Sequence, residues 1–554
     1  MELRIFGPPG TGKTTRLARR ASVAAEKFGA SNVMVSSFTR AAAAELVSRD
    51  LPLPKENVGT LHALCWRALE RPEIAEPHAA EFSAAHQLFR LSRVGADLDE
   101  PAHDRKLWSD ADKLLLAYNR LRALMVERAA WPASVAGFAA AWEGWKREAG
   151  YLDFTDLIEH CLLDTRGAPG APKVGLFDEA QDFTRLQTAL IRKWAASMDH
   201  VLLCGDDDQL LYGWIGASVD AFLEPPLPEA HTEVLAQSYR VPRAVHALAA
   251  RWITQVARRY PKVYLPRDAE GEVTATSATW RAPEPLLSEI EAALAAGETI
   301  MVLAACGYML EPVIQMLRRH GLPYHNPYRK KRGDWNPLAT RKGAVGAAER
   351  LYYYLRPLWE IDGARARVWS VSALSLWVEH LKAEEVLVRG LKARLADLRS
   401  ADTPREARAW IARVAEILAP EALGALSAML DQGVPELAWF RDRLLTSRAA
   451  SYEFPWAVAT ARGPEALTAT PSVIVGTIHS VKGGEADRVV LFPDLSLQGF
   501  AEWQRAGSEG HDAVARQFYV GLTRARRKLI LTAPAGELAV RGLVKGTDDE
   551  RRIE

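Results

Sequence analysis

A glycine-rich stretch near the start of the chain has the residue types and spacing of a phosphate-binding loop. GPPGTGKT (7–14) fits the pattern G-x-x-x-x-G-K-[ST] and stands between a strand pattern and a helical one. Glycines let backbone N–H groups face phosphate, Lys13 is expected to reach the β- and γ-phosphates, and Thr14 to offer its hydroxyl to Mg²⁺. The alternative, an ordinary glycine-rich turn, is disfavoured by the flanking elements and the Lys-Thr pair. The predicted contact residues are Gly7, Pro8, Pro9, Gly10, Thr11, Gly12, Lys13, Thr14 and Thr15.

Two adjacent acids follow an apolar strand pattern in LFDEAQD (176–182). A phosphate loop needs a carboxylate that holds the metal ion and a group that activates water. We expect Asp178 to bind Mg²⁺ and Glu179 to accept the proton of the attacking water. In isolation the same letters fit an acidic helix start. Beside the phosphate loop, the catalytic interpretation is favoured.

Three further side chains suit a triphosphate, although each is a weak indication alone. Gln209, in GDDDQLLYGW (205–214), follows a strand pattern, where a glutamine is placed to sense a γ-phosphate or position water. SYR (238–240) and GLTRARRK (521–528) each present an arginine, which neutralises charge that develops on phosphate. A solvated surface charge is the simpler reading of either arginine taken singly.

Alternating strand and helix patterns must position these segments. Helical patterns begin at about Thr14 and in TRAAAAELVSR (39–49), and residues 70–150 have only helical periodicity. The alternation predicts a parallel, doubly wound sheet with a helical insertion. The strand patterns are LRIF (3–6), NVMVSSF (32–38), VGLFDEA (174–180), VLLCGDD (201–207) and TEVLAQSY (232–239).

A second set of strand patterns occupies EVTATSA (272–278), ETIMVLAACG (298–307), PSVIVGTIHS (471–480), DRVVLF (487–492) and KLILTA (528–533). The residues between them, 329–465, are helical in pattern. We therefore predict an α/β protein with two parallel-sheet domains, each with a helical insertion. The expected boundaries are 1–69 and 151–240 for the first sheet domain, 70–150 for its insertion, 241–328 and 466–554 for the second, and 329–465 for the second insertion. The insertion tryptophans expected mainly in cores are Trp142, Trp145, Trp359, Trp369 and Trp377.

Composition limits the other classes of function. At 554 residues, with 48% hydrophobic and 25% charged residues, the chain has the character of a soluble multidomain protein. A net charge of +1 confines any nucleic-acid surface to a local patch. No run approaches the roughly 20 apolar residues of a membrane span, and no secretory leader is evident, so we expect a cytoplasmic protein. Four separated cysteines without a CxxC pair argue against a zinc or iron–sulfur cluster and predict buried thiols.

The order of the segments is more informative than any one of them. GPPGTGKT, SSFTRAAAAEL, GTLHALCWRAL, YLDFTDLI, LFDEAQD, GDDDQLLYGW, QSYRVP, VGTIHSVKGGEADRVVLFP and FYVGLTRARRKL resemble, in this order, the consecutive motifs of superfamily 1 helicases. The closest resemblance is to the UvrD/Rep group, and it covers both sheet domains. It implies two RecA-like P-loop motor domains with ATP and Mg²⁺ between them. It also implies a monomeric core that acts on single-stranded DNA and on junctions of single and double strands, without a membrane partner.

The resemblance assigns roles within the nucleotide site. Gln209 would couple the γ-phosphate to the DNA track, and Arg524 would be the arginine finger of the second domain. Tyr239 would stack on adenine beside Arg240, which would contact the γ-phosphate. Glu485, in HSVKGGEAD, would link the ribose to the domain interface. The family usually has an adenine-reading glutamine before the phosphate loop, where this chain has MELRIF, so Tyr239 is expected to hold the base. The implied catalytic residues are Lys13, Glu179, Gln209, Arg240 and Arg524.

The resemblance also implies a strand-binding surface. Its residues are Phe38, Thr60, His62, Tyr212 and Trp214 in the first domain and His479 and Lys482 in the second. Aromatic faces stack on any base, each for roughly 1–3 kcal/mol, which agrees with this assignment. A core position is an equally open reading of Phe38 or Trp214 taken singly. Closure of the motor domains on ATP would change the spacing of the two surfaces and move the strand.

Several alternatives stay open at this point. We expect 3′→5′ movement with duplex unwinding, although GPPGTGKTT and RARRKL also fit the 5′→3′ branch of the superfamily. A translocase that strips or remodels protein–nucleic acid complexes without unwinding would share these motifs, and an RNA substrate is not excluded. A small-molecule kinase is disfavoured by Arg524 and the paired insertions. Basic and aromatic residues interleave in 318–342, which fits either a duplex contact or a solvated face.

Overall fold

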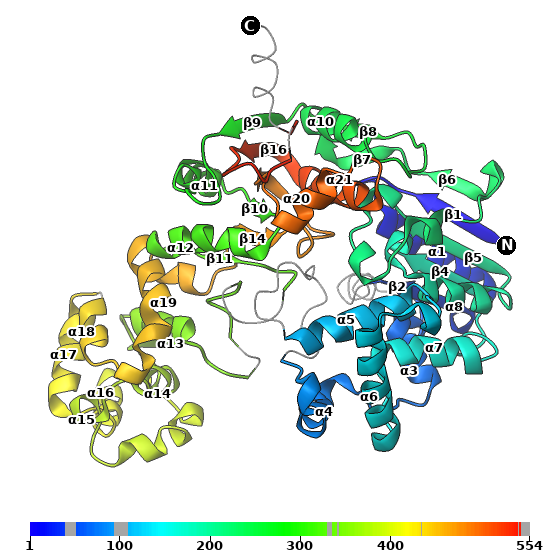
Figure 1. The fold of residues 1–554 in the computed structure, drawn as a ribbon. Helices are drawn as coiled ribbons and strands as arrows, with labels where there is room; N and C mark the ends of the chain where they lie inside the picture. The colour runs from blue at the N-terminus through cyan, green and yellow to red at the C-terminus, as the bar shows by residue number, and fades with distance from the viewer. Residues whose placement is uncertain are drawn as a thin grey trace, which may run out of the picture. The chain divides into compact units, whose positions relative to one another are not determined.

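The computed structural model describes residues 1–38, 51–92, 109–329, 335–340, 343–433, 435–540 and 542–543 (Figure 1). The helix expected over 39–49 therefore lies outside the described residues. The chain forms two compact units. Unit 1 contains Met1–Leu286, Ile300–Leu310 and Gly476–Glu554, and unit 2 contains Leu287–Thr299 and Glu311–Val475.

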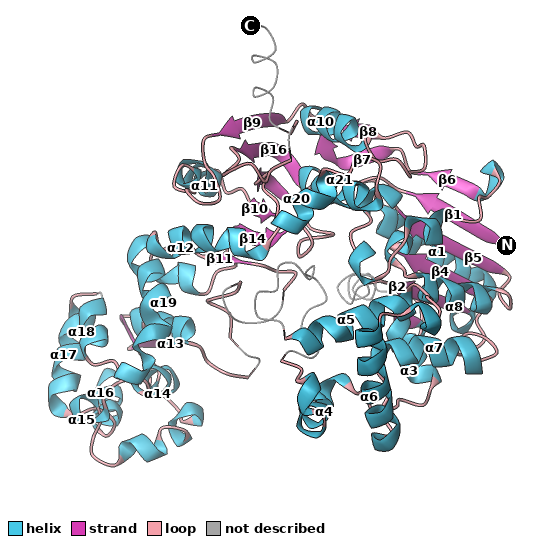
Figure 2. Ribbon diagram, viewed as in Figure 1, coloured by secondary structure: helices cyan, strands magenta, loops and turns pink. Residues whose placement is uncertain are grey.

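Unit 1 contains a parallel six-stranded sheet in the order β3-β2-β4-β5-β1-β6 (Figures 1 and 2). Every residue of β2 and β4 is buried, as strands covered on both faces require. The doubly wound sheet predicted from the sequence is confirmed. Its strands are β1 (Glu2–Phe6), β2 (Val33–Ser37), β3 (Val58–Thr60), β4 (Val174–Asp178), β5 (His200–Gly205) and β6 (Thr232–Val234).

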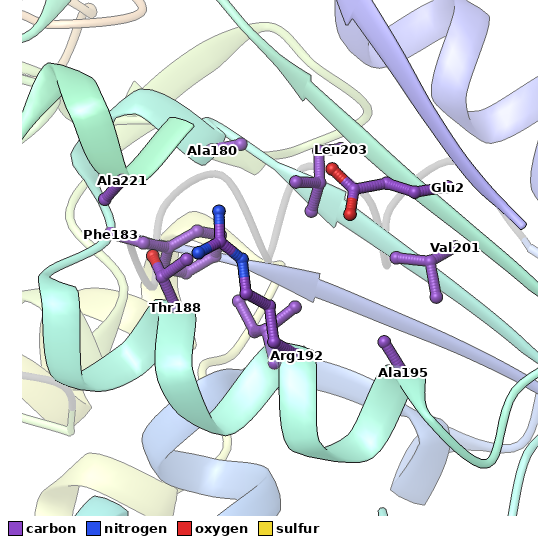
Figure 3. Close-up of a pocket in the computed structure, with 10 residues that line it drawn as sticks. Glu2, Ala180, Phe183, Thr188, Arg192, Ala195, Val201, Leu203 and Ala221 are labelled. Atoms are coloured by element: carbon purple, nitrogen blue, oxygen red, sulfur yellow. The ribbon is translucent and has the colours of Figure 1, made fainter. Parts of the chain in front are cut away.

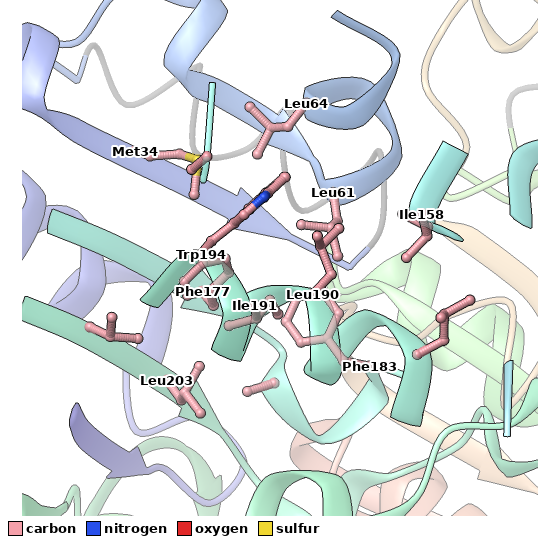
Figure 4. Close-up of a cluster of buried hydrophobic side chains, with 14 of the residues drawn as sticks. Met34, Leu61, Leu64, Ile158, Phe177, Phe183, Leu190, Ile191, Trp194 and Leu203 are labelled. Carbon is pink, nitrogen blue, oxygen red and sulfur yellow. The ribbon is translucent and has the colours of Figure 1, made fainter. Parts of the chain in front are cut away.

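Apolar side chains cover both faces of this sheet. Met34 and Val35 are neighbours in β2 but belong to different clusters, because successive strand residues point to opposite faces. One cluster lies under α1, and the other packs around Trp194 (Figure 4). These cores fix the strand ends that carry the polar motifs. The helices are α1 (Lys13–Phe28), α3 (Leu61–Ala68), α7 (Phe154–Asp164), α8 (Arg185–Ala195) and α9 (Val219–Leu223).

The first insertion is helical in its described part, as predicted. It consists of α4 (Ala79–Ala85), α5 (Asp110–Ala123) and α6 (Ala133–Ala149). Trp142 and Trp145 are buried in its aromatic core, which confirms their expected place. A buried ionic network connects it to α7: Arg122 Nη1 lies 3.0 Å from Asp153 Oδ1, and Lys146 contacts Asp153 and Asp156. Removing these charges from water costs free energy that offsets much of their mutual attraction.

Four parallel strands of a second sheet also belong to unit 1, in the order β10-β15-β16-β9. The prediction of one continuous strand over 232–239 is wrong. The segment divides into β6 and β7 (Gln237–Pro242), because the chain leaves β1 after Leu235 and pairs with β8 (Leu265–Arg267) instead. The other elements are β9 (Glu272–Thr276), β10 (Ile300–Ala304), β15 (Ala486–Leu491), β16 (Ala525–Thr532), α10 (Arg243–Ile253), α20 (Leu497–Trp503) and α21 (Glu509–Leu522).

Unit 2 is mainly helical, and in it β11 (Tyr324–His325) pairs in parallel with Val473 and Ile474, the first residues of β14 (Val473–Thr477). The segment 329–465, expected to be a helical block, also contains an antiparallel hairpin of β12 (Trp359–Ile361) and β13 (Ala366–Val368). Trp369 and Trp377 are buried around Tyr354, whereas Trp359 is half-buried. The helices are α11 (Leu286–Ala295), α12 (Glu311–Arg319), α13 (Ala347–Leu355), α14 (Val371–Val378), α15 (Ala383–Val386), α16 (Ala407–Ala415), α17 (Pro420–Asp431), α18 (Leu437–Asp442) and α19 (Ala449–Arg462).

The cysteine thiols are buried in the described part of the chain, as predicted. No helix there is long and apolar enough to cross a membrane. The four cysteines form no disulfide with one another, and the described residues contain no group of three or more His, Cys, Asp or Glu side chains that could hold a metal ion.

Candidate nucleotide site and strand-binding surface

The phosphate-loop sequence forms a tight loop between β1 and α1. Gly10 and Gly12 have φ values of +75° and +79°, a region that favours glycine. A Cβ on Gly10 would lie 2.4 Å from Arg240 Cβ, so the loop also needs glycine for close approach to β7. Ser238 Oγ donates to Pro9 O over 2.9 Å, and the Tyr239 N–H donates to Gly10 O over 2.8 Å. The loop is thus held by the strand that carries Tyr239 and Arg240.

The residues predicted to hold phosphate and metal meet at the carboxyl ends of β1 and β4. Thr14 Oγ1 donates to Asp178 Oδ2 over 3.1 Å, and Lys13 Nζ donates to Gly7 O within the loop over 2.6 Å. Burial, followed by the adjacent charge of Glu179, raises the pKa of Asp178 to about 7. A hydroxyl and one buried carboxylate beside a phosphate loop suit Mg²⁺, which takes few protein ligands and completes its shell with phosphate and water.

Glu179 stands in a constrained position directly after β4. Its φ of +54° is unusual for a residue with a side chain, and Gln181 Nε2 donates to its carboxylate. Burial acts to raise its pKa, but the charges of Lys482 and Lys13 outweigh burial, so the pKa of Glu179 is lowered. A half-buried carboxylate that is kept charged in this way is available to accept a proton.

Gln209 and Arg524 meet in the interior of unit 1. Arg524 Nη2 donates to Gln209 Oε1 over 3.1 Å, and Arg524 Nη1 donates to Gly484 O over 3.1 Å. The Gln209 amide is held on its other side, where Nε2 donates to Asp206 Oδ2 over 2.6 Å. The arginine that follows α21 is therefore connected by one amide to the loop that follows β5.

Arg240 and Glu485 form a second link between distant segments. Arg240 Nε lies 2.6 Å from Glu485 Oε2, and Arg526 contacts the other oxygen of the same carboxylate. The Tyr239 side chain next to Arg240 is 70% exposed. An exposed aromatic ring beside the phosphate loop is available to stack on a planar base.

Lys482 connects the acidic motif to the Gln209 loop. Its ammonium contacts the Asp182 carboxylate, donates to Gln209 O over 3.1 Å and lies 3.6 Å from Glu179 Oε2. It also lies 5.3 Å from the centroid of the Tyr212 ring. In this structure its charge is engaged by acids of the first sheet, so its predicted contact with DNA stays a prediction.

The other predicted strand-binding residues differ in their exposure. Phe38, His62 and Trp214 are half-buried, and the Phe38 ring lies 5.0 Å from the ring of Tyr212. Tyr212 and His479 are only 4% and 6% exposed, so neither presents a ring face to a base here. Thr60 caps α3, where its hydroxyl accepts from Ala63 N over 3.3 Å. Of the basic stretch 318–342, residues 330–334 and 341–342 lie outside the described residues.

The structure adds residues that motif matching does not select. Asp182 stands inside LFDEAQD, so its proximity to Glu179 could have indicated a part in the site. Lys262 and Tyr264 stand in RRYPKVYLP, which matches no motif, yet Tyr264 Oη donates to Pro9 O over 3.0 Å. A cavity beside α8, lined by Glu2, Thr188, Arg192 and Leu203 among others, contains no phosphate-loop residue (Figure 3).

Comparison with known proteins gives one family match and several similar relatives. Residues 2–226 match the UvrD/REP helicase N-terminal domain. The chain is 26% identical over 309 residues to the ATP-dependent DNA helicase PcrA of Staphylococcus aureus, which covers 49% of this chain and 40% of that protein. It is 28% identical over 296 residues to PcrA of Leuconostoc citreum, covering 49% and 39%. The match thus spans well under half the length of these relatives.

Proposed function

We propose that this chain, whose residues 2–226 match the UvrD/REP helicase N-terminal domain, is a UvrD-like superfamily 1 helicase that hydrolyses ATP to move along single-stranded DNA and to unwind duplex DNA. The observation that carries the proposal is the Arg524–Gln209 hydrogen bond, because it brings an arginine of the second sheet to the loop after β5. An arginine contributed from a second element can neutralise the charge that develops during phosphoryl transfer. The motor domains are those expected above, 1–69 with 151–240 and 241–328 with 466–554.

The side chains of the nucleotide site divide the chemistry among them. Lys13 and the loop N–H groups bind the phosphates, and Thr14 with Asp178 would hold Mg²⁺, which neutralises phosphate charge when bound. Glu179 accepts the proton of the attacking water, since its neighbouring cations keep it ionised. Arg524 and Arg240 stabilise charge on the γ-phosphate, and Tyr239 packs on the adenine.

Coupling to the strand follows from the contacts of Gln209 and Lys482. The Gln209 side chain accepts a hydrogen bond from Arg524, and its backbone carbonyl accepts one from Lys482. A movement of Gln209 when the phosphate is bound or hydrolysed would therefore displace the segment that carries His479 and Lys482. We propose that Phe38, Thr60, His62 and Trp214 hold one part of the strand. His479 and Lys482 hold the next part once the site opens, and movement is 3′→5′.

The decisive experiment measures ATP hydrolysis and strand displacement together on 3′-tailed, 5′-tailed and blunt DNA, with Lys13→Ala as the inactive control. Hydrolysis stimulated by single strands and displacement from the 3′ tail alone would support the proposal. Displacement from the 5′ tail would reverse the polarity, and stimulation without displacement would indicate a remodelling translocase. Stronger stimulation by RNA would change the substrate. Hydrolysis indifferent to nucleic acid would contradict the proposed function.

A further inference from the structure

A buried lysine organises the loop that presents Gln209. The Lys262 side chain is 1% exposed, and its Nζ lies 3.2 Å from Asp206 Oδ1, 2.6 Å from Asp207 Oδ1 and 2.8 Å from Asp208 Oδ2. Three adjacent carboxylates that are almost fully buried would repel one another strongly without this cation. Lys262 therefore contacts all three acids that stand directly before Gln209 and offsets their mutual repulsion.

The segment around Lys262 adds further contacts to the same loop. Arg259 donates to both oxygens of Asp208, over 2.9 and 2.6 Å, and the Tyr260 N–H donates to Asp207 Oδ2 over 2.7 Å. The Tyr260 ring stacks on Phe6 at the end of β1, with a centroid separation of 4.0 Å. We call residues 256–264 the clasp, because every acid of the triple is bound by it.

The other side of the clasp holds the helix that ends next to Arg524. The Ala257 N–H donates to Asp512 Oδ1 over 3.1 Å, and Arg516 Nη2 donates to Arg258 O over 2.5 Å. Asp512 and Arg516 both belong to α21, whose last residue lies two positions before Arg524. One short segment thus binds the Gln209 loop and the arginine helix, and its Tyr264 reaches the phosphate loop.

The hydrogen-bond pattern of Gln209 shows what Lys262 controls. An amide has one donating end and one accepting end, and a guanidinium only donates. Asp206 Oδ2 accepts from Gln209 Nε2, which turns the amide oxygen toward Arg524, while Asp206 Oδ1 faces Lys262. If Asp206 turned away, the amide could flip and place its NH₂ group against the guanidinium.

We propose that Lys262 is a positioning residue for hydrolysis: through Asp206 it fixes the amide of Gln209 so that its oxygen binds Arg524. This inference rests on the proposed function, since it concerns the same nucleotide site. It differs from a stabilising role, because a lysine that only held the fold would lower turnover whether or not Gln209 were present.

A double-mutant cycle separates the two roles. The variants are Lys262→Met, Lys262→Arg, Gln209→Ala and the two combinations, with Lys193→Met as control. Lys193 Nζ donates to Leu162 O over 2.5 Å, within the same sheet domain and away from this loop. Single-strand-stimulated kcat, KM for ATP, binding of a non-hydrolysable ATP analogue and thermal unfolding are measured for each protein.

We expect Lys262→Met to lower kcat by about 10²-fold, with analogue affinity changed less than about threefold, since a small misplacement of a catalytic group has that effect. Lys262→Arg keeps the positive charge but changes the shape of the side chain, so its kcat should fall by a smaller factor. In the Gln209→Ala background, either Lys262 substitution should lower kcat by less than about threefold. If Lys262→Met does not fold, the Lys262→Arg cycle alone decides.

If kcat of each double variant fell by the product of the two single-variant factors, the inference would be overturned. Unchanged kcat in both single Lys262 variants would overturn it as well. Either result leaves the proposed function intact as long as the wild type hydrolyses ATP with DNA stimulation. Absence of hydrolysis in the wild type would contradict the proposed function itself. The Lys193→Met control should keep wild-type kcat and melting behaviour.

Discussion

Arg524 Nη2 donates a hydrogen bond of 3.1 Å to Gln209 Oε1 across 315 residues of sequence. Both side chains are buried, at 1% and 6% exposure, so the contact is not a chance meeting of surface groups. An arginine held in this way is already ordered before a phosphate arrives. Less conformational entropy is then lost when the guanidinium turns to the γ-phosphate.

Arg524→Ala should therefore abolish turnover while nucleotide still binds. We expect kcat to fall by about 10³–10⁵-fold, the range for an arginine that stabilises phosphoryl transfer. The exposed neighbour Arg527, changed to alanine, is the matched control and should keep turnover. The measurement is steady-state hydrolysis beside binding of a fluorescent ATP analogue. Turnover within about threefold of wild type would remove the finger role from Arg524.

Glu179→Gln should separate binding from hydrolysis. The change keeps the size of the side chain and its hydrogen bond with Gln181 but removes the proton acceptor, so kcat should fall about 10²–10⁴-fold. Analogue affinity should stay near that of the wild type, because Lys13 and the loop N–H groups remain. Asp164→Asn, an exposed acid at the end of α7, serves as control. Near-normal DNA-stimulated hydrolysis by Glu179→Gln would contradict the assignment of Glu179 as the general base.

Phe38→Ala should weaken binding of single-stranded DNA by roughly 1–3 kcal/mol if the ring stacks on a base. The alternative is that Phe38 mainly packs against Tyr212 and Phe183, with ring centroids 5.0 and 6.1 Å away. Titration of a labelled oligonucleotide, beside a thermal melt, distinguishes the two. Lower affinity with an unchanged melting temperature supports stacking, whereas a lower melting temperature with unchanged affinity indicates a core aromatic. Phe28→Ala, near the end of α1, is the comparison variant.

Site residues could be predicted from the sequence where they stand in one contiguous motif. GPPGTGKT and LFDEAQD each follow a buried strand, and parallel strands bring their carboxyl ends together, so the Thr14–Asp178 contact could be expected from pattern alone. The pairing of Arg524 with Gln209 could be anticipated only through the order of the motifs. Nothing in the local pattern of either segment specifies a partner 315 residues away.

Other features could not be predicted from the sequence because they depend on tertiary contacts. Lys262 meets Asp207 across 55 residues, and a lysine in a loop otherwise reads as a solvated charge. The strand expected over 232–239 divides because Leu235 N still donates to Phe6 O, whereas Leu265 N donates to Ala236 O. The hairpin β12–β13 was detectable, since Asp362-Gly363 is a turn pair between two short β-prone segments.

The ionisation of Glu76 should make the stability of the buried ionic network depend on pH. It lies beside Asp153, and Phe154 N donates to its Oε1 over 3.0 Å, while its Oε2 is buried with no hydrogen-bond partner among the described residues. Burial, followed by the charge of Asp153, raises the pKa of Glu76 to about 8, against the opposing charge of Lys146. The folded protein therefore holds a proton here at neutral pH that the unfolded chain has released.

Because the folded state binds the extra proton, the free energy of unfolding should fall as pH rises from about 4.5 to about 8. Glu76→Gln mimics the protonated form, so it should remove this part of the pH dependence, which amounts to at most about 5 kcal/mol across the window. Urea unfolding at several pH values between 5 and 8.5, read by tryptophan fluorescence, measures the slope. Glu148→Gln, an exposed acid on α6, should leave the wild-type slope in place. Equal slopes for wild type and Glu76→Gln would mean that Glu76 is already ionised in the folded protein.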